Sequence, residues 1–329
     1  MSAHSVLTAL GAVLLVAACR EQHAVMQPQG PYAAEIAQLA WVLFIGGGVI
    51  FAAVIAATWV AMRGPLSWRK LLADRHTVIA GGIAFPIAVL TALLAYNAVW
   101  LRAEQAAFTR EPVLRLDIVG EQWWWRVAYP GDGGAAIATA NEIYIPVGRE
   151  VELALRSNDV IHSFWVPSLG GKADMIPGRT TRLRLKADRP GVFRGLCAEY
   201  CGGPHALMAL PVVAIPAVEF QAWSIRESAP AVEPTVETEQ RGKSLFIAAG
   251  CGGCHAVRGT PAIGTVGPDL THFGGRRSVG VDTIPVTKSN VVNFIVNGQH
   301  VKPGNLMPQF RIFAEHDLDA LASYLLMLR

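Results

Sequence analysis

The sequence predicts a membrane protein of three parts: a hairpin of two transmembrane helices, a small β domain and a C-terminal helical domain. Three observations support this division. Two long apolar runs lie in the first third of the chain, and a region of alternating apolar and polar residues follows them. Residues 241–329 then carry helical signals around a Cys-x-x-Cys-His motif. The length of 329 residues also exceeds what one ordinary hydrophobic core accommodates.

The composition supports a membrane-embedded part and excludes some classes of partner. The chain is 52% hydrophobic and only 16% charged, which is a low charge content for a soluble protein. Its net charge is +3, and we expect no nucleic-acid partner because no lysine-rich patch accompanies that charge. The five cysteines form one C-x-x-C-H motif, one C-x-x-x-C motif and one isolated residue. An odd number argues against a pure disulfide framework.

Residues 1–19 are typical of a targeting leader. An apolar run that ends in small residues precedes Cys19, as in a signal peptide. The string Val16-Ala17-Ala18-Cys19 resembles a bacterial lipoprotein cleavage site, in which Cys19 would carry the lipid. The lack of Lys or Arg before the apolar run weakens this interpretation, and the alternative is a free cysteine in an uncleaved leader.

Residues 36–101 are predicted to form a transmembrane hairpin. Ile36 to Met62 and Thr77 to Leu101 are almost free of charge, and each is long enough to span a bilayer. Two buried core helices of this length would be unusual. The tryptophans near the ends of the runs suit a membrane interface, and the loop between the runs is basic. The tryptophans near the ends of the runs are Trp41, Trp59 and Trp100. The basic residues of the loop are Arg63, Arg69, Lys70 and Arg75. A basic loop stays in the cytoplasm, so we expect everything after residue 101 on the outer side of a bacterial cytoplasmic membrane.

The remaining chain is predicted to contain a β domain at 112–223, a linker at 224–240 and a helical domain at 241–329. Residues 114–118, 151–156 and 182–186 alternate with period two, which predicts half-buried antiparallel strands in a small sandwich or barrel. Ser, Pro, Glu and Thr dominate the linker, which predicts a flexible tether without a tight docking surface. In the helical domain we expect Ser289 to cap a helix over Asn290–Asn297, and a closing helix over Glu315–Leu328.

The motif Cys251-Gly252-Gly253-Cys254-His255 is typical of covalent haem c attachment. Its two thiols can add to the two vinyl groups on one porphyrin edge, and the adjacent His255 can reach the iron. A redox dithiol would need a βαβ context, and zinc would need a second pair of ligands, neither of which is evident. The second iron ligand should be a soft or nitrogenous group far downstream of the motif, and Met307 is the candidate. A thioether ligand would raise the haem potential. His272, His300 and His316 are the alternatives.

A second cluster of soft ligands lies upstream of the haem motif. Cys197, Cys201, His205 and Met208 fall within one short segment, and His162 precedes them in the chain. Thiolate, imidazole and thioether are the ligands of redox-active copper. Two cysteines indicate two coppers bridged by both thiolates, with one histidine completing each copper. A Cys197–Cys201 disulfide and a structural Cys₂His₂ zinc site are the alternatives, and the zinc site would leave Met208 unused.

Two family resemblances rest on these and neighbouring residues. Residues 241–329 resemble a class I cytochrome c through Cys251–His255, Gly267-Pro268-Asp269-Leu270, Met307-Pro308 and the closing helix. Residues 36–223 resemble subunit II of the haem–copper cytochrome c oxidases. The strings that carry this resemblance are GEQWWW at 120–125, DVIHSFWVPSLGGKADMIPGR at 159–179 and RPGVFRGLCAEYCGGPHALM at 189–208. Together, the two parts resemble the cytochrome c-fused subunit II of a caa3-type oxidase.

The resemblance implies a cupredoxin-like β-barrel that holds the binuclear Cu-A centre. Its ligands would be Cys197, Cys201, His162, His205, Met208 and the backbone carbonyl of Glu199. The Glu199 carboxylate would bind a magnesium ion shared with subunit I. Met307 would be the iron ligand, which leaves the three other histidines at the surface. Leu196 stands where relatives often have Gln. Glu104 near the second apolar run is the candidate for the acidic residue that admits protons in many relatives, and the alternative is a carboxylate at the membrane interface.

The resemblance also implies the function. An electron would enter at Trp123, Trp124 and Trp125, although side chains alternate along a strand and at least one of the three is expected to be a packing residue. The donor would be cytochrome c or a membrane quinol-oxidising complex. The partners would be subunits I and III of a proton-translocating oxidase and membrane lipid, with oxygen reduced in subunit I. The alternatives are a subunit of a Cu-A-containing nitric oxide reductase, a copper-delivery or thiol-redox protein, and a structural subunit without metals.

Overall fold

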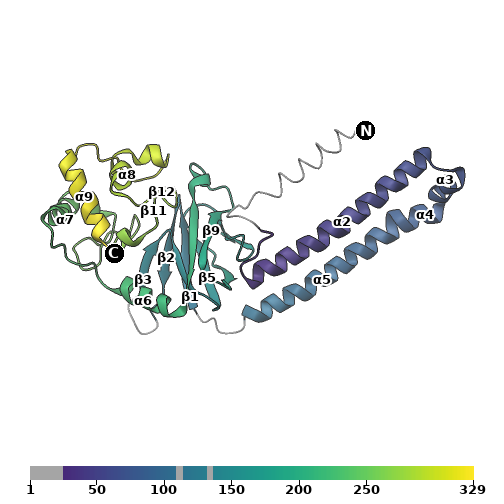
Figure 1. Ribbon diagram of the computed structural model, residues 1–329, viewed down its shortest axis with the longest axis horizontal. Helices are drawn as coiled ribbons and strands as arrows, with labels where there is room; N and C mark the ends of the chain where they lie inside the picture. Colours follow the sequence, from purple (N-terminus) through teal and green to yellow (C-terminus); the bar gives the residue numbers. More distant parts are fainter. Residues whose placement is uncertain (1–24, 109–113, 132–135) are drawn as a thin grey trace. The chain divides into compact units, whose positions relative to one another are not determined.

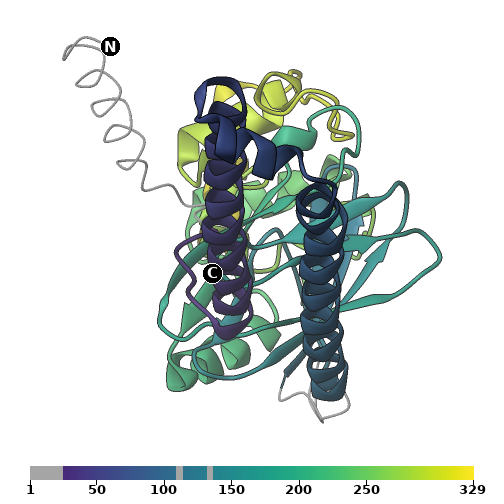
Figure 2. The same ribbon diagram turned by 90° about the vertical axis from the view of Figure 1, so that its right-hand side faces the viewer.

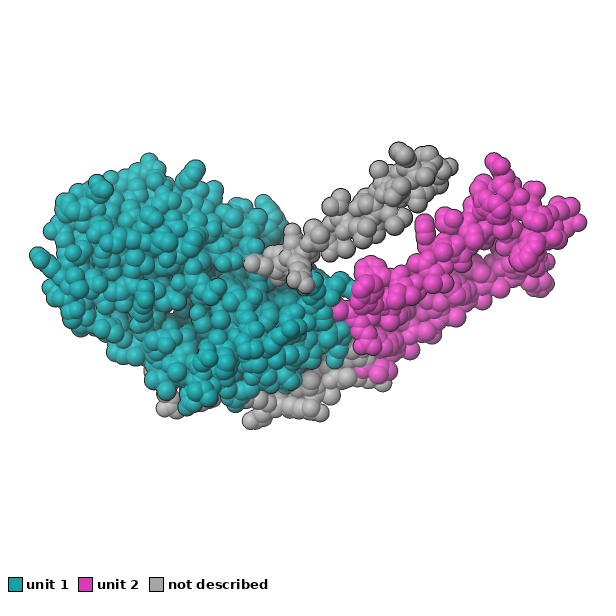
Figure 3. All heavy atoms as spheres, viewed as in Figure 1, with its two compact units in different colours: residues 1–35, 113–329 teal, residues 36–112 magenta. Residues whose placement is uncertain are grey.

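The structure, a computed structural model, describes residues 25–108, 114–131 and 136–329 (Figure 1). It divides into two compact units, one of residues 36–112 and one that combines residues 1–35 with 113–329 (Figure 3). The leader and Cys19 lie outside the described residues, so the lipidation of Cys19 stays a prediction.

The unit of residues 36–112 is built from two long helices joined by short ones. The elements are α2 (Pro31–Arg63), α3 (Leu66–Ala73), α4 (Arg75–Ile79), the π-helical turn η1 (Ala80–Ala84) and α5 (Phe85–Phe108). The two long helices run alongside each other (Figures 1 and 2). Pro31–Arg63 and Arg75–Val99 are long and apolar enough to cross a membrane, and their apolar side chains, Trp41 and Trp59 included, are exposed. The predicted hairpin is therefore confirmed as a pair of apolar helices. The side chains of Trp100 and Glu104 lie outside the described part.

The β domain consists of two five-stranded sheets. The strands are β1 (Leu114–Glu121), β2 (Trp124–Tyr129), β3 (Ile137–Ala140), β4 (Ile143–Pro146), β5 (Val151–Ser157), β6 (His162–Trp165), β7 (Lys172–Met175), β8 (Thr181–Leu185), β9 (Gly191–Cys197) and β10 (Ala209–Ile215). One sheet has the order β3-β2-β1-β5-β8 and the other the order β4-β10-β9-β6-β7. The three alternating segments form β1, β5 and β8, so they are confirmed as strands.

The pairing of the strands differs in part from the prediction. Strands β1 and β5 pair in parallel, and so do β4 and β10, whereas the sequence predicted antiparallel strands throughout. Alternation specifies which side chains face the core but not the neighbouring strand, which explains the difference. The core side chains follow the expected period: Leu116 and Ile118 of β1 and Leu153 and Leu155 of β5 are fully buried.

The C-terminal domain is helical and has its own core. Its elements are α7 (Glu237–Ala248), the 3₁₀ turns η3 (Cys251–Gly253) and η4 (Phe273–Gly275), the short strands β11 (Ser278–Val279) and β12 (Ile284–Pro285), α8 (Lys288–Val301) and α9 (Glu315–Met327). Helices α7 and α9 cross closely at Gly242, where a Cβ atom would lie 2.0 Å from the Ala320 carbonyl oxygen. The closing helix is confirmed. The cap of α8 is Thr287 rather than Ser289, because the Thr287 hydroxyl accepts a hydrogen bond from the Asn290 amide.

The segment between the β domain and the helical domain is partly helical. Helix α6 (Ala217–Ser228) extends into the predicted linker from one side and α7 from the other. The two domains also contact each other directly. Arg194 of β9 pairs with Asp282 at 3.3 Å, and Arg126 of β2 donates to the Thr265 carbonyl at 2.8 Å. A flexible tether removes the need for such contacts, and composition alone does not reveal pairs that form only after folding.

Candidate metal centre and haem site

Neighbouring strands of one sheet position the sulfur and imidazole cluster. His162 begins β6, Cys197 ends β9, and Phe164 of β6 is paired with Cys197 across the two strands. Strand β10 begins at Ala209, directly after Met208, and pairs with β9 through Leu196. The loop between β9 and β10, residues 198–208, therefore starts and ends at the same sheet edge and folds back over His162.

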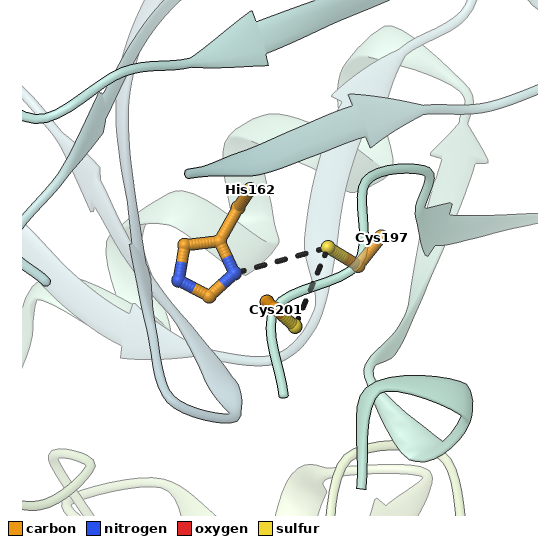
Figure 4. A group of neighbouring side chains, drawn as sticks. All are labelled: His162, Cys197 and Cys201. Carbon is orange, nitrogen blue, oxygen red and sulfur yellow. Dashed lines mark hydrogen bonds between the residues drawn. The ribbon is translucent and has the colours of Figure 1, made fainter. Parts of the chain in front are cut away.

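The two thiols and one imidazole form the centre of this cluster (Figure 4). The Cys197 Sγ lies 3.8 Å from the His162 Nδ1 and 3.8 Å from the Cys201 Sγ. All three donor atoms lie within 4.8 Å of one another, and all three residues are buried. Both cysteines are free thiols, so the structure does not contain the alternative disulfide.

Three further donor atoms surround the two sulfurs. The Cys201 Sγ lies 3.3 Å from the His205 Nδ1 and 3.8 Å from the Met208 Sδ. The Glu199 carbonyl oxygen lies 3.2 Å from the Cys197 Sγ. The loop and β6 thus bring two thiols, two imidazoles, one thioether and one carbonyl together, each within 3.8 Å of at least one of the two sulfurs. This donor set fits copper, and the inward position of the Met208 thioether is not explained by a Cys₂His₂ zinc site.

Hydrogen bonds orient the His162 ring and favour the thiolate form of one cysteine in this cluster. The Asp159 carboxylate lies 2.8 Å from the His162 Nε2, which leaves Nδ1 as the nitrogen that faces the thiols. A hydrogen bond with Cys201 lowers the pKa of the Cys197 thiol, and the same contact raises the pKa of Cys201. One of the two sulfurs is therefore favoured as thiolate, the form that binds metals.

A cavity of about 410 Å³ lies in the helical domain, next to the C-x-x-C-H motif. Cys251, Cys254, His255 and Met307 all line it. Its remaining wall is mostly apolar and includes Leu270, Phe273, Phe294, Ile295, Phe310 and Leu321. A largely apolar cofactor fits such a cavity, and both thiols of the motif line it.

The imidazole of His255 is held in one orientation. Its Nδ1 donates to the Pro268 carbonyl oxygen at 2.8 Å, so the lone pair of Nε2 stays available for a metal. Gly267 makes room for the ring, because a Cβ atom there would lie 2.6 Å from the His255 Cε1. Burial lowers the pKa of His255, which favours the neutral form that ligates iron.

The comparisons with known proteins match two parts of the chain to known families. Residues 132–215 match the family described as cytochrome c oxidase subunit II, periplasmic domain, and residues 239–329 match the cytochrome c family. Cytochrome c oxidase subunit 2 of Bacillus sp. (strain PS3) is 31% identical over 265 residues, which cover 77% of this chain and 73% of that protein. The chain belongs to the cytochrome c oxidase subunit 2 family. Its C-terminal cytochrome c domain agrees with the expected fused architecture.

Other relatives share parts of the subunit. Cytochrome c oxidase subunit 2 of Alkalihalophilus pseudofirmus is 42% identical over 214 residues, or 65% of this chain. The match spans 61% of that relative, which is less than two thirds of its length. The crystal structure of the periplasmic domain of subunit II of cytochrome oxidase from Bradyrhizobium japonicum is 31% identical, covers 36% of this chain and 99% of that one, and has a TM-score of 0.34.

The three tryptophans of the subunit occupy different environments. Trp123 and Trp124 are half-buried and line the haem cavity from the β domain. The Trp123 Nε1 donates to the Cys201 carbonyl at 3.0 Å, and the Arg126 guanidinium lies 4.7 Å from the Trp124 ring centroid. Trp125 is fully buried in the β core, where its Nε1 donates to the Ala209 carbonyl. The position of Trp125 is that of a packing residue, the role expected for at least one of the three.

The other predicted residues of the subunit are placed as follows. His300 and His316 are exposed as expected, but the expectation of a surface position was wrong for His272, which is buried because its ring packs against the chain at Ala229 and bonds that carbonyl. None of these three histidines lines the haem cavity. The Glu199 side chain is exposed, and within the described ranges it joins no cluster of metal-ligating side chains. Sequence reasoning missed Asp159 as the partner of His162, although its position three residues before a predicted ligand was a usable signal.

Proposed function

We propose that the subunit transfers electrons in a terminal respiratory oxidase, from a donor through haem c to Cu-A and onward to subunit I, where O₂ is reduced to water. One observation carries this proposal. Trp123 lines the haem cavity with its ring and bonds the Cys201 carbonyl with its indole nitrogen, so a single side chain touches both sites. An electron-transfer role requires such a short connection, and copper delivery does not.

The copper centre is proposed to use the donor atoms gathered around the two thiols. Cys197 and Cys201 would bridge two coppers, His162 and His205 would complete one copper each, and the Met208 thioether and Glu199 carbonyl would be weak ligands. The separations of 3.2 to 3.8 Å among these atoms support this arrangement. Bound copper and haem would supply one-electron redox chemistry. The buried protein groups would keep water away and hold the ligands in place.

The haem is proposed to attach through thioether bonds to Cys251 and Cys254. His255 and Met307 would be its axial ligands, since both line the cavity and the three alternative histidines do not. The Pro268 carbonyl orients the His255 ring, and the Asn305 side chain accepts a hydrogen bond from the Met307 amide at 3.0 Å. Both ligand segments are therefore held by local hydrogen bonds.

The rest of the assembly is proposed from the family. The apolar helices would anchor the subunit in the cytoplasmic membrane, with the copper and haem domains on the periplasmic side, in contact with subunits I and III. Cytochrome c or a quinol-oxidising complex would be the donor. The exposed Glu199 carboxylate is free to meet a magnesium ion shared with subunit I. Proton translocation would belong to the whole complex.

Optical spectroscopy and metal analysis of the purified complex test the proposal. We expect haem c together with two coppers per subunit, a near-infrared Cu-A band and uptake of O₂. One copper per subunit without that band would contradict the electron-transfer role and favour copper delivery. Uptake of NO in place of O₂, with the Cu-A band present, would assign the subunit to a nitric oxide reductase.

A further inference from the structure

A buried lysine joins the haem domain to the copper-binding domain. Lys302 directly follows α8, and only 3% of its surface is exposed. Its Nζ donates to the backbone carbonyls of Trp123 at 2.5 Å and Leu207 at 3.1 Å, both in the β domain. A third, longer contact of 3.4 Å reaches the Gly280 carbonyl of the haem domain itself. The lysine nitrogen therefore bonds to both domains.

Both carbonyls across the interface belong to segments that shape the copper site. Trp123 bonds the carbonyl of Cys201, and Leu207 directly precedes Met208. The contact continues two residues further along the haem domain, at Gly304. A Cβ atom on Gly304 would lie 3.3 Å from the Trp123 ring, so backbone and indole pack directly against each other. Lys302 and Gly304 thus hold the haem domain against Trp123, a side chain that touches both sites.

Some contacts across this interface are more exposed. The Arg194–Asp282 ion pair has side-chain exposures of 38% and 31%, and exposed ion pairs contribute little and are screened by salt. The bonds of Lys302 differ, because a buried contact is screened much less by salt than an exposed ion pair. Docking through Lys302 is therefore less sensitive to salt than docking through the exposed pair.

We propose that Lys302 is a positioning residue that holds the haem domain in one docked pose on the copper-binding domain, so that Trp123 stays in contact with both redox sites. The proposal rests on the proposed electron-transfer function. It assigns a role to a residue that ligates neither cofactor. It also predicts that docking depends on a buried contact rather than on charges at the surface.

Amine labelling of the wild-type complex tests the docking without any substitution. We expect acetic anhydride to modify Lys302 at least about tenfold more slowly than Lys288, which begins α8 and has a side chain 49% exposed. Burial lowers the pKa of Lys302 to about 7, so its amine is the better nucleophile and slow labelling must reflect protection. Equal labelling of the two lysines would overturn the proposal.

Substitution of Lys302 then tests what the contact does. In the Lys302→Met complex, we expect the amide of Arg277 to exchange hydrogen about tenfold faster or more, because its N–H donates to Glu142 across the interface at 2.6 Å. Electron transfer from haem c to Cu-A after photoinjection should slow and become sensitive to salt. Lys288→Met is the matched control, since Lys288 pairs with Asp319 inside the haem domain, and it should change neither quantity.

Each outcome separates this proposal from the proposed function. If Lys302→Met retains the haem and Cu-A bands but has the wild-type exchange and transfer rates, Lys302 does not position the domain. If Lys302→Met fails to assemble, the labelling of the wild-type complex still decides the matter. If the wild-type complex lacks the Cu-A band, the electron-transfer function fails, whereas slow labelling of Lys302 would still show a docked interface.

Discussion

The indole nitrogen of Trp123 donates a hydrogen bond to the backbone carbonyl of Cys201, and the two atoms lie 3.0 Å apart. Cys201 carries one of the two sulfurs of the proposed copper centre. On its other side, the Trp123 ring lines the haem cavity and packs against Gly304. This hydrogen bond, together with the one that Gln122 donates to the same carbonyl at 2.7 Å, connects the backbone of a proposed copper ligand to the wall of the haem site.

Replacement of Trp123 by Phe should slow electron transfer from haem c to Cu-A several-fold. Phe keeps an aromatic ring but cannot donate to the Cys201 carbonyl, so the connection loses its hydrogen bond. The rate of Cu-A reduction after a flash measures the effect. Trp124→Phe is the comparison and should change this step less, because Trp124 has no hydrogen bond to Cys201. A normal rate in Trp123→Phe would place the path elsewhere.

Replacement of Cys197 by Ser should abolish the binuclear copper spectrum while haem c stays attached. A hydroxyl is a harder and poorer ligand for copper than a thiolate, and one sulfur cannot form the double bridge. Electron paramagnetic resonance and the near-infrared band of the purified complex report the result. Survival of the wild-type copper spectrum in Cys197→Ser would exclude a bridge through this sulfur.

Replacement of Asp159 by Asn should weaken copper binding by about 10- to 100-fold, the usual range for a residue that orients a metal-ligating histidine. Asn is less basic as an acceptor and no longer stabilises the His162 tautomer that exposes Nδ1 to the thiols. Competition with a copper chelator measures the affinity. Asp174→Asn is the matched control, because Asp174 is exposed and pairs only with Lys172. Equal affinities of the two variants would remove Asp159 from the site.

Replacement of Met307 by Ala should leave the haem covalently attached and lower its reduction potential. A thioether ligand raises the potential of haem iron, and the thioether bonds to Cys251 and Cys254 do not depend on Met307. Redox titration at the haem c absorption band gives the potential. His300→Ala serves as the control and should leave the potential unchanged. The same potential in Met307→Ala and the wild type would exclude Met307 as the ligand.

Replacement of Gly267 by Ala should disturb iron ligation by His255. The new methyl group would lie 2.6 Å from the imidazole Cε1, which is closer than van der Waals contact permits, so the ring must move. We expect a changed Soret band and a lower melting temperature of the haem domain. Gly253→Ala is the control, because no atom lies within 4 Å of a Cβ built there. An unchanged spectrum in Gly267→Ala would mean that the ring has room to adjust.

Motifs of short range were predictable from the sequence because covalent spacing alone determines them. The haem motif Cys251–His255 and the pair Cys197 and Cys201 each lie within five residues, so their neighbours in the chain are their neighbours in space. The apolar helices were also predictable, since a long uncharged run has few alternatives to a helix that crosses a membrane. Apolar and polar residues that alternate with period two predicted strands β1, β5 and β8, because successive side chains of a strand point to opposite faces of the sheet.

The sequence by itself determined the cofactor-binding motifs, the apolar helices and the type of each domain, because these depend on residues close together in the chain. Only the tertiary structure decided which strands pair in parallel, which tryptophan faces both sites and that Lys302 bonds the Trp123 carbonyl 179 residues away. Such contacts depend on how folded surfaces meet. No local pattern encodes them, because a buried lysine and an exposed one look the same in the sequence.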